Sequence, residues 1–195
     1  MIMRQIFFLS LLFFLITGSS IVQGQDRANK SKSKFTNNLW FGASAGLDLR
    51  NYTNPSYFTI ALFPMVGYKI TPNISAGPRI GIGLQSLKYR LSSSQIAKTT
   101  LFYVSEAAFA RFKFFNMFFI HGEFEIAQSQ NATFDQITLK ANKFWEQENN
   151  AYGGVGYYSS GGNFGSEIYI LYNFLEDSNT TNFPIQFRAG LTYNF

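Results

Sequence analysis

Apolar and polar residues alternate strictly along the end of the chain. Counting back from Phe195 to Phe183, every second residue is apolar, and the residues between them are Asn, Thr, Gly, Arg and Gln, with Pro184 last. A period of two residues is the pattern of a β-strand with one apolar and one polar face. The pattern therefore predicts a strand that continues to the last residue of the sequence.

The same alternation recurs in seven earlier segments, so that eight strands are predicted in all. The earlier segments cover residues 39–49, 58–70, 74–84, 100–114, 118–126, 149–158 and 164–173, and the sixth of them is rich in glycine. The predicted connections are short at "TPN", "FNM" and "SSGGN" and mostly longer at 50–56, 86–99, 128–148 and 175–182. Tight turns at one end, longer loops at the other and an even number of strands of about ten residues are typical of an outer-membrane barrel. The predicted fold class is all-β, an eight-stranded antiparallel up-and-down transmembrane β-barrel.

The composition indicates which face of this barrel points outward. Aromatic residues reach 18% and charged residues only 14%, well below the ~25% charged residues of ordinary soluble domains. One face of the strands carries nearly all the large apolar side chains, and the other carries Gly, Ser and Thr together with the charges. A soluble lipocalin-like carrier would place its apolar face inward, and a lipid-binding cavity could not hold those charges. The pattern favours a membrane barrel over the soluble carrier, which is the alternative.

The first residues have the three-part layout of a secretory signal peptide: a cation in "MIMR", the apolar run "QIFFLSLLFFLITG" and small residues before Gln25. We therefore predict a signal peptide (1–24), a basic flexible periplasmic segment (25–37) and the barrel (38–195), with both termini periplasmic. The chain has no cysteine, which excludes disulfides and thiolate metal sites. The net charge of +5 comes partly from Arg4 and the basic segment, so we expect no nucleic-acid partner. An anionic envelope surface is the alternative partner for that segment.

Three stretches carry a family resemblance. "RAGLTYNF", with Tyr193 and Phe195, resembles the C-terminal strand signal that the barrel-assembly machinery of Gram-negative bacteria recognises. "PMVGYKITPNISAG" and "AFARFKFF" resemble segments of the small outer-membrane β-barrel family, porin-like or OmpA-type, and the likeness spans residues 37–195. The resemblance implies an outer-membrane location, contact with outer-membrane lipids and lipopolysaccharide, and reading of Phe195 during insertion. We also expect Phe195 to pack against lipid. The resemblance implies a fold and a location but no reaction.

Three residues depart from the strand pattern. Pro64 and Pro78 lie inside predicted strands, where each removes a hydrogen bond from the ladder, so we expect a local bulge at each. Glu106 falls on the apolar face of its strand. Either a bulge near Ser105 re-aims it, or it lies at the outer membrane interface, where a carboxylate is tolerated.

The polar face predicts a charged barrel interior. Its ionisable residues are Arg79, Arg111, His121, Glu123, Glu125, Glu167 and Arg188. Counted from the short turns, Arg111, His121 and Glu167 lie at similar depth and Arg79 and Glu123 form the next layer, so opposite charges are expected to pair. Eight strands enclose a space that side chains fill, and Phe109 and Phe119 share the inward parity. We expect a plugged barrel with a structural or surface-loop interaction role, and a narrow porin is an alternative.

Catalysis is not expected, although a lipid A-modifying enzyme is the enzyme alternative. His121 is the only histidine and shares its parity with Glu123 and Glu125, so it faces the interior close to a turn, whereas a deacylase-type site must face lipid. Interior ion pairs account for the two glutamates more simply than acid/base or metal chemistry. We expect no cofactor and no metal. The loop 128–150 carries the aromatic residues Phe134, Phe144 and Trp145. We expect them either to cap the barrel or to lie at the lipid interface. The alternative is that they contact a ligand or an unknown extracellular or envelope partner.

Overall fold

The structure is a computed structural model that describes residues 34–51, 56–90, 96–135, 140–176 and 184–195. The predicted signal peptide and residues 25–33 of the basic segment lie outside the described residues. Residues 34–37 of that segment were expected to be flexible, but they form a helical turn, α2 (Lys34–Asn37), directly before the first strand.

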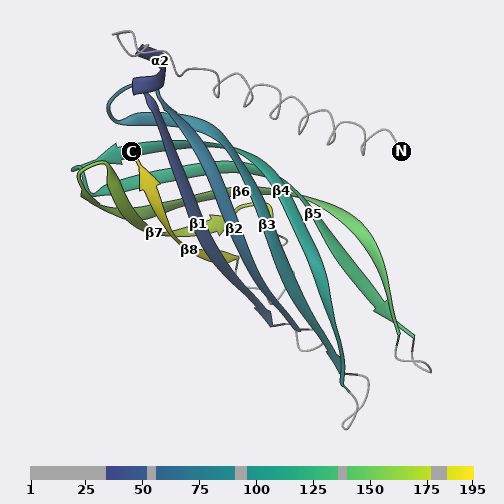
Figure 1. The fold of residues 1–195 in the computed structure, drawn as a ribbon. Coiled ribbons are helices and arrows are strands. Elements are labelled where there is room, and N and C mark those ends of the chain that lie inside the picture. The colour runs from purple at the N-terminus through teal and green to yellow at the C-terminus, as the bar shows by residue number, and fades with distance from the viewer. Residues whose placement is uncertain (1–33, 52–55, 91–95, 136–139, 177–183) are drawn as a thin grey trace, which may run out of the picture. The chain divides into compact units, whose positions relative to one another are not determined.

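Eight antiparallel strands follow α2 and close into a barrel in sequence order (Figure 1). They are β1 (Leu39–Asn51), β2 (Ser56–Lys69), β3 (Ile74–Arg90), β4 (Ile96–Phe114), β5 (Phe118–Phe134), β6 (Ala141–Gly161), β7 (Phe164–Asn173) and β8 (Ile185–Tyr193). This confirms the predicted fold class. The turns at 70–73, 115–117 and 162–163 define the short-turn end, and the opposite end is called the long-loop end.

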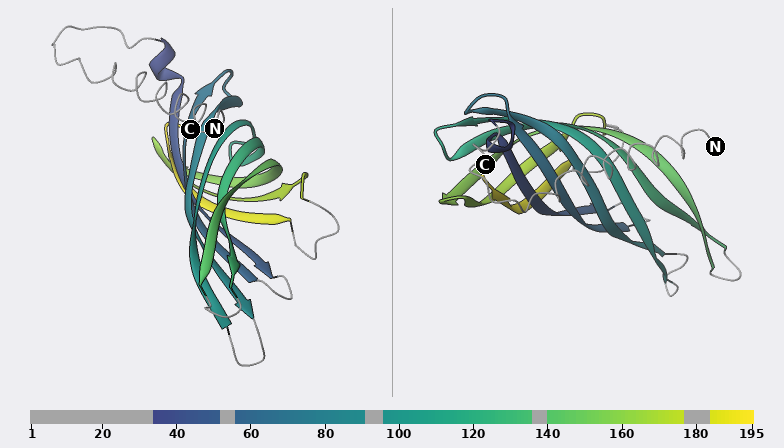
Figure 2. Two further views of the ribbon diagram at one scale, coloured as in Figure 1. Left: turned by 90° about the vertical axis from the view of Figure 1, so that its right-hand side faces the viewer. Right: turned by 45° about the horizontal axis from the view of Figure 1, so that its top comes forward.

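The strands differ greatly in length, and this corrects two predicted loops. Segments 86–99 and 128–148 were predicted as connections, but most of their residues extend β3, β4, β5 and β6. In the second hairpin the pairing continues out to Phe134 and Ala141. The extension of β5 and β6 lacks strict alternation and is largely exposed, whereas Leu87 and Ala97 in the extensions of β3 and β4 are buried. Figures 1 and 2 show these long strands running past the ends of the shorter strands.

The register is unbroken at the three residues that depart from the pattern, so the predicted bulges are wrong. Strands β2 and β3 pair Leu62 with Ile82 and Met65 with Arg79, which leaves equal numbers of residues on both strands around Pro64. Pro78 faces Ala108 in continuous register.

Glu106 keeps the outward parity of its strand and lies between Ile80 and Ile126. Exposed apolar residues, Ile82 and Phe102 among them, continue beyond it toward the long-loop end. Glu106 is therefore half-buried within the apolar band, neither re-aimed by a bulge nor at the edge of the band.

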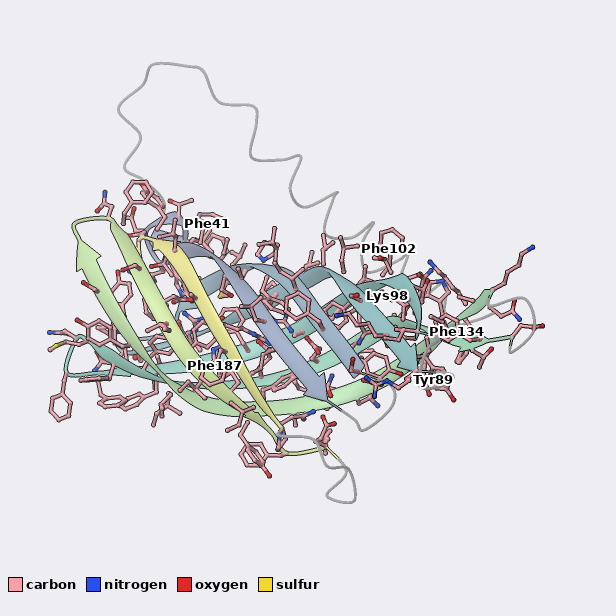
Figure 3. All side chains as sticks on the ribbon, turned by 90° about the horizontal axis from the view of Figure 1, so that it is seen from below. Phe41, Tyr89, Lys98, Phe102, Phe134 and Phe187 are labelled. Atoms are coloured by element: carbon pink, nitrogen blue, oxygen red, sulfur yellow. The ribbon has the colours of Figure 1, made fainter. Side chains whose placement is uncertain are left out.

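The apolar face of the strands points outward, as predicted. Leu62 is 62% exposed, Ile82 59% and Phe102 55%, and Phe41 and Phe102 project from the barrel wall in Figure 3. The ionisable side chains of the polar face point inward and are buried: Arg79, Arg111, His121, Glu123, Glu125, Glu167 and Arg188. Within the described ranges, no helix is long and apolar enough to cross a membrane.

Candidate functional site in the barrel interior

The middle of the barrel holds a buried cluster of opposite charges. Its members are three arginines, Arg79, Arg111 and Arg188, and three glutamates, Glu123, Glu125 and Glu167. They come from five strands, β3, β4, β5, β7 and β8, so the cluster spans the barrel cross-section. Because positive and negative groups are equal in number, the cluster as a whole is neutral, which is what a site shielded from water requires.

Glu123 is the centre of this cluster. Arg79 donates to it from Nε at 2.9 Å and from Nη2 at 2.8 Å. Arg188 donates from Nη1 at 3.0 Å and from Nη2 at 3.1 Å. One carboxylate therefore joins β3, β5 and β8 through two forked contacts, the strongest geometry available to an arginine–carboxylate pair.

Glu125 extends the cluster toward the long-loop end. It accepts from Arg79 Nη2, from Ser105 Oγ at 3.0 Å and from Asn150 Nδ2 at 3.0 Å. The Tyr103 hydroxyl lies 2.9 Å from Glu125 Oε2. Three donors therefore converge on Oε2, while Oε1 accepts from Asn150 and faces the long-loop side.

Arg111 forms the layer nearer the short-turn end. It donates to Glu167 from Nη1 at 2.7 Å and from Nη2 at 3.1 Å. Its guanidinium is surrounded by aromatic rings at 4.6 to 5.6 Å from their centroids, those of Trp40, Phe109, Phe119, Tyr169 and Phe195. Ring faces attract cations, most strongly where water is excluded, so the rings and Glu167 together compensate the buried charge.

His121 bridges the two layers, and its contacts determine its tautomer. Arg111 Nε lies 2.9 Å from His121 Nδ1. Because an arginine can only donate, Nδ1 must accept and the ring proton is on Nε2. Nε2 then donates to Glu123 Oε2 at 3.1 Å. The histidine is held as a neutral connector between an arginine and a carboxylate, and both of its nitrogens are occupied.

Aromatic side chains close the interior at the short-turn end, and Phe195 is one of them. Its ring centroid lies 4.6 Å from that of Trp40, 4.9 Å from that of Tyr158 and 6.1 Å from that of Phe119. The expectation that Phe195 packs against lipid is therefore wrong. Tyr193, two residues earlier, does face outward and is 43% exposed.

Asn194 accounts for the inward position of Phe195. Its φ is +60°, a left-handed conformation that asparagine tolerates better than most residues. Its side chain donates to the carbonyl of Leu39 at 2.7 Å. The alternation of inward and outward side chains therefore ends at Tyr193. The left-handed conformation of Asn194 turns the side chain of Phe195 into the barrel interior.

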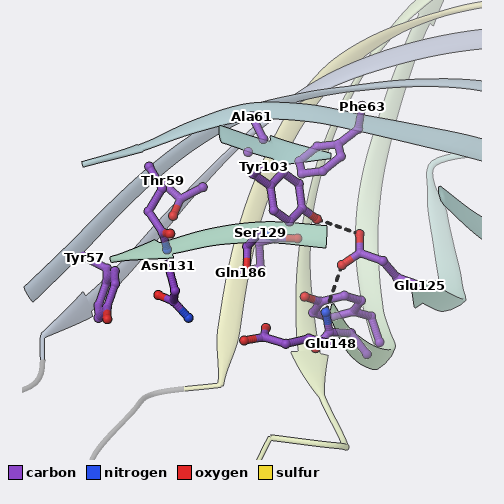
Figure 4. Close-up of a pocket in the computed structure, with 14 residues that line it drawn as sticks. Tyr57, Thr59, Ala61, Phe63, Tyr103, Glu125, Ser129, Asn131, Glu148 and Gln186 are labelled. Atoms are coloured by element: carbon purple, nitrogen blue, oxygen red, sulfur yellow. Dashed lines mark hydrogen bonds between the residues drawn. The ribbon is translucent and has the colours of Figure 1, made fainter. Parts of the chain in front are cut away.

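A cavity of about 240 Å³ lies on the other side of the charged layer, toward the long-loop end. Its walls are polar and aromatic, and Figure 4 shows Tyr57, Tyr103, Ser129 and Gln186 around it. Glu125 lies at its inner limit, where it is bound to Tyr103 and Asn150. This cavity was not foreseen from the sequence, because alternation assigns side chains to a face but does not show where they leave a space, and Ser129, Asn131 and Glu148 of its wall lie in a segment predicted as a loop.

The interior brings together all seven ionisable residues singled out in the sequence, whereas Tyr193 lies apart on the outer face. Sequence reasoning missed the neutral partners Tyr103, Ser105 and Asn150, and the bond of 2.8 Å between Ser44 Oγ and the Tyr169 hydroxyl. Their inward parity was the available signal. Among the described residues, no group of three or more His, Cys, Asp or Glu side chains could hold a metal.

Comparisons with known proteins identify the fold. No family model matches the chain, and no curated protein matches it. Among solved structures, it is similar to Ail, the attachment invasion locus protein of Yersinia pestis, which was solved in complex with the heparin analogue sucrose octasulfate. The TM-score is 0.51 and the sequence identity 11%, and the match covers 80% of this chain and 95% of that chain. Neisserial surface protein A matches at a TM-score of 0.48 and 14% identity, over 81% and 97%. The N-terminal β-barrel domain of Pseudomonas aeruginosa OprF matches at 0.40 and 13%, over 80% and 97%.

Proposed function

We propose that the protein is an integral outer-membrane β-barrel of a Gram-negative bacterium, closed to solutes, whose role is structural or lies in the interactions of its long-loop end. The observation that carries this proposal is the neutral charged cluster of the interior. Glu123 and Glu125 with Arg79 and Arg188, and Glu167 with Arg111, join side chains across the barrel. The aromatic side chains around Phe195 lie on the short-turn side of these ion pairs.

The outer face supports the membrane location. Large apolar side chains are exposed on every strand, including Phe41, Leu62, Ile82, Phe124 and Leu191. A surface of this kind would be unstable in water, because contiguous apolar patches of such extent promote association. Outer-membrane lipids are therefore the proposed solvent of this face, and the barrel-assembly machinery is the proposed partner during insertion.

Lipopolysaccharide is the proposed partner just above this band, where two lysines face each other. Lys88 of β3 lies directly opposite Lys98 of β4, four pairs beyond Leu84 and Phe102. Lys143 Nζ reaches the Thr100 carbonyl at 2.7 Å and brings a third cation to the same strand. Like charges directly opposite are destabilising in isolation, so an anionic headgroup phosphate would relieve their repulsion.

Catalysis forms no part of the proposal. A lipid A-modifying enzyme needs a nucleophile or base that reaches lipid, but His121 is buried and both of its nitrogens are bound. The glutamates of the interior are likewise bound by arginines. The proposal therefore assigns the histidine and the glutamates of the interior to the plug.

The test of the proposal is electrical recording across a planar bilayer. The refolded wild type is expected to show no stable open conductance, while Arg79→Ala combined with Arg111→Ala is expected to leak, because the double change removes two of the three buried cations. Ser86→Ala, on the outer face, is the matched control and should behave as the wild type. A large, steady wild-type conductance would contradict the plug and favour the narrow porin.

A further inference from the structure

We propose that the cavity at the long-loop end binds one uncharged, hydroxylated aromatic ring, which enters from the lipid boundary through a split in the barrel wall between β4 and β5. The cavity measures about 240 Å³, below the roughly 300–1,000 Å³ of pockets that take drug-sized ligands. It therefore suits a molecule with a single ring. The route from the lipid rests on the outer-membrane location proposed above.

The hydrogen-bonded ladder between β4 and β5 stops before either strand ends. Its last pair is Tyr103 with Ser129. Strand β4 starts earlier, at Ile96, and β5 runs on to Phe134. Beyond the last pair, β4 is paired only with β3, and β5 only with β6. The wall therefore divides into two hairpins, whose ends lie apart in Figure 1 and in the right-hand view of Figure 2. The ring of Tyr89 stacks on that of Phe134 across the outer part of the split, with centroids 5.8 Å apart.

Side chains, rather than the backbone, join the two edges of the split nearer the barrel. Gln130 Oε1 accepts a hydrogen bond from the backbone nitrogen of Phe102 at 3.1 Å. Lys143 Nζ donates to the carbonyl of Thr100 at 2.7 Å. Both contacts are exposed, and exposed side chains change rotamer within nanoseconds. The split can therefore open without breaking any bond of the backbone ladder.

The split lies between the cavity and the apolar outer face. Tyr103 and Ser129, the last ladder pair, line the cavity, and so does Asn131 beyond them (Figure 4). Phe102, next to Tyr103 in the chain, points outward and is 55% exposed. A molecule dissolved at the edge of the apolar band would therefore meet the split directly beside the cavity.

The lining of the cavity offers both ring contacts and hydrogen-bond partners. Tyr57, Tyr103 and Tyr152 line it, and aromatic rings pack favourably on one another edge to face or with an offset. Thr59 and Gln85 line it as well, and within the described part of the chain neither side chain makes a hydrogen bond to another residue. A hydroxyl on the ligand can both donate to such groups and accept from them. A phenol-type ring is complementary to this lining.

The charges at the cavity are already compensated, which favours an uncharged ligand. Glu125 is bound by Arg79, and Glu148 has an interaction partner of its own. Among the described residues, the lining contains no lysine or arginine. An ionic ligand would therefore give up its hydration without gaining a free counter-charge, which is costly in a partly enclosed site. Because the charged layer lies beneath the cavity, the ligand is held there and does not pass through the barrel.

Fluorine NMR on the full mature protein, refolded in micelles, tests the binding. The probe is 4-fluorophenol, with 4-fluorobenzenesulfonate as the anionic comparison and protein-free micelles as the background. We expect saturable binding of 4-fluorophenol at one site per barrel and none of the sulfonate. Gln85→Leu should weaken binding by about fivefold, the worth of one hydrogen bond, and Tyr57→Ala should also weaken it.

Ser86→Ala is the matched control for the cavity, because Ser86 follows Gln85 but faces outward, and it should bind like the wild type. Equal binding of the sulfonate would overturn the proposal. Unchanged binding in both cavity variants would overturn it as well, and so would the lack of saturable binding to correctly folded protein.

The route is tested by closing the split. Because the chain has no cysteine, Phe102→Cys with Gln130→Cys can be joined selectively by a short bis-maleimide. We expect the crosslink to slow the exchange of bound 4-fluorophenol by about tenfold or more, as for a site whose lid cannot open. The same variant with its two thiols capped by N-ethylmaleimide should exchange at least as fast as the wild type. Equal exchange rates in the joined and capped forms would overturn the entrance. Both measurements are made without a bilayer, so their failure is distinguishable from a failure of the conductance test.

Discussion

Arg111 holds Glu167 through both of its terminal nitrogens, at 2.7 and 3.1 Å, and thereby joins β4 to β7 across the barrel interior. The two strands are not neighbours in the sheet. The pair therefore acts as a crosslink that the backbone ladder does not provide.

Removing one member of this pair should be much more damaging than removing both. Glu167→Gln leaves the guanidinium buried without its counter-charge, and we expect the free energy of unfolding to fall by about 3–5 kcal/mol. Arg111→Met together with Glu167→Leu replaces charge with apolar volume and should cost less than the single change. Urea unfolding in micelles measures both, with the exposed Lys88→Ala as control. Additive losses in the double variant would contradict the coupling.

Phe195 and Tyr193 offer a matched test of the inward and outward aromatic positions. Phe195→Ala removes a ring from the cluster with Trp40 and Tyr158, so we expect a loss of about 1–3 kcal/mol in the refolded protein. Tyr193→Ala should change micellar stability little, because its ring faces outward. If Phe195 is also read during insertion, its folded yield in cells should fall further than this stability loss explains. Equal yields for the two variants would exclude that signal.

A small residue at position 67 leaves room for the indole of Trp40. A Cβ built at Gly67 would lie 2.1 Å from that ring, which no side chain permits. Gly67→Ala should therefore displace Trp40 and lower stability by about 1–3 kcal/mol. Gly122→Ala is the control, because a Cβ there meets nothing within 4 Å. Tryptophan fluorescence and thermal unfolding follow both variants, and an unshifted spectrum in Gly67→Ala would contradict the packing.

The proposal that the protein does not modify lipid A can be checked on lipid A itself. Mass spectrometry of lipid A from cells with and without the gene should give the same species. His121→Ala should leave those species unchanged but lower barrel stability, because Arg111 Nε loses its acceptor. An acyl group whose presence depends on both the gene and His121 would establish the enzyme alternative.

The lysine pair above the apolar band should respond to lipopolysaccharide. Lys88→Ala with Lys98→Ala removes two facing cations, so the thermal stabilisation that added lipopolysaccharide gives the wild type should shrink. Raising the salt concentration should weaken the wild-type effect in the same direction, since exposed charges are screened. Lys69→Ala is the control, because Lys69 lies at the short-turn end of β2 and the lysine pair lies toward the long-loop end. Equal stabilisation of all three proteins would contradict a headgroup contact at this pair.

Strand parity made most of the interior predictable, because period-two alternation assigns a face to each residue regardless of tertiary detail. Arg79 and Glu123, on strands that are not adjacent, could be placed at one depth by counting from the turns. Parity failed where a single backbone angle intervenes, at Asn194, and so Phe195 was assigned to the wrong side. It also missed the strand extensions, since residues such as Asn142 and Gln147 pair in a hairpin without burying either face. Alternation placed most of the cavity's lining on the inner face, but it could not show that those side chains leave a space open.

The closure between the first and last strands is the short seam of this barrel. Strands β1 and β8 pair only over Phe41–Leu47, whereas β3 and β4 pair along Ile74–Arg90. Contacts outside the ladder reinforce the seam: Asn194 donates to the carbonyl of Leu39, and the ring of Phe195 lies on Trp40. Those contacts can form only after the first and last strands have met. They therefore act as a latch, which must be broken before the first and last strands can separate again.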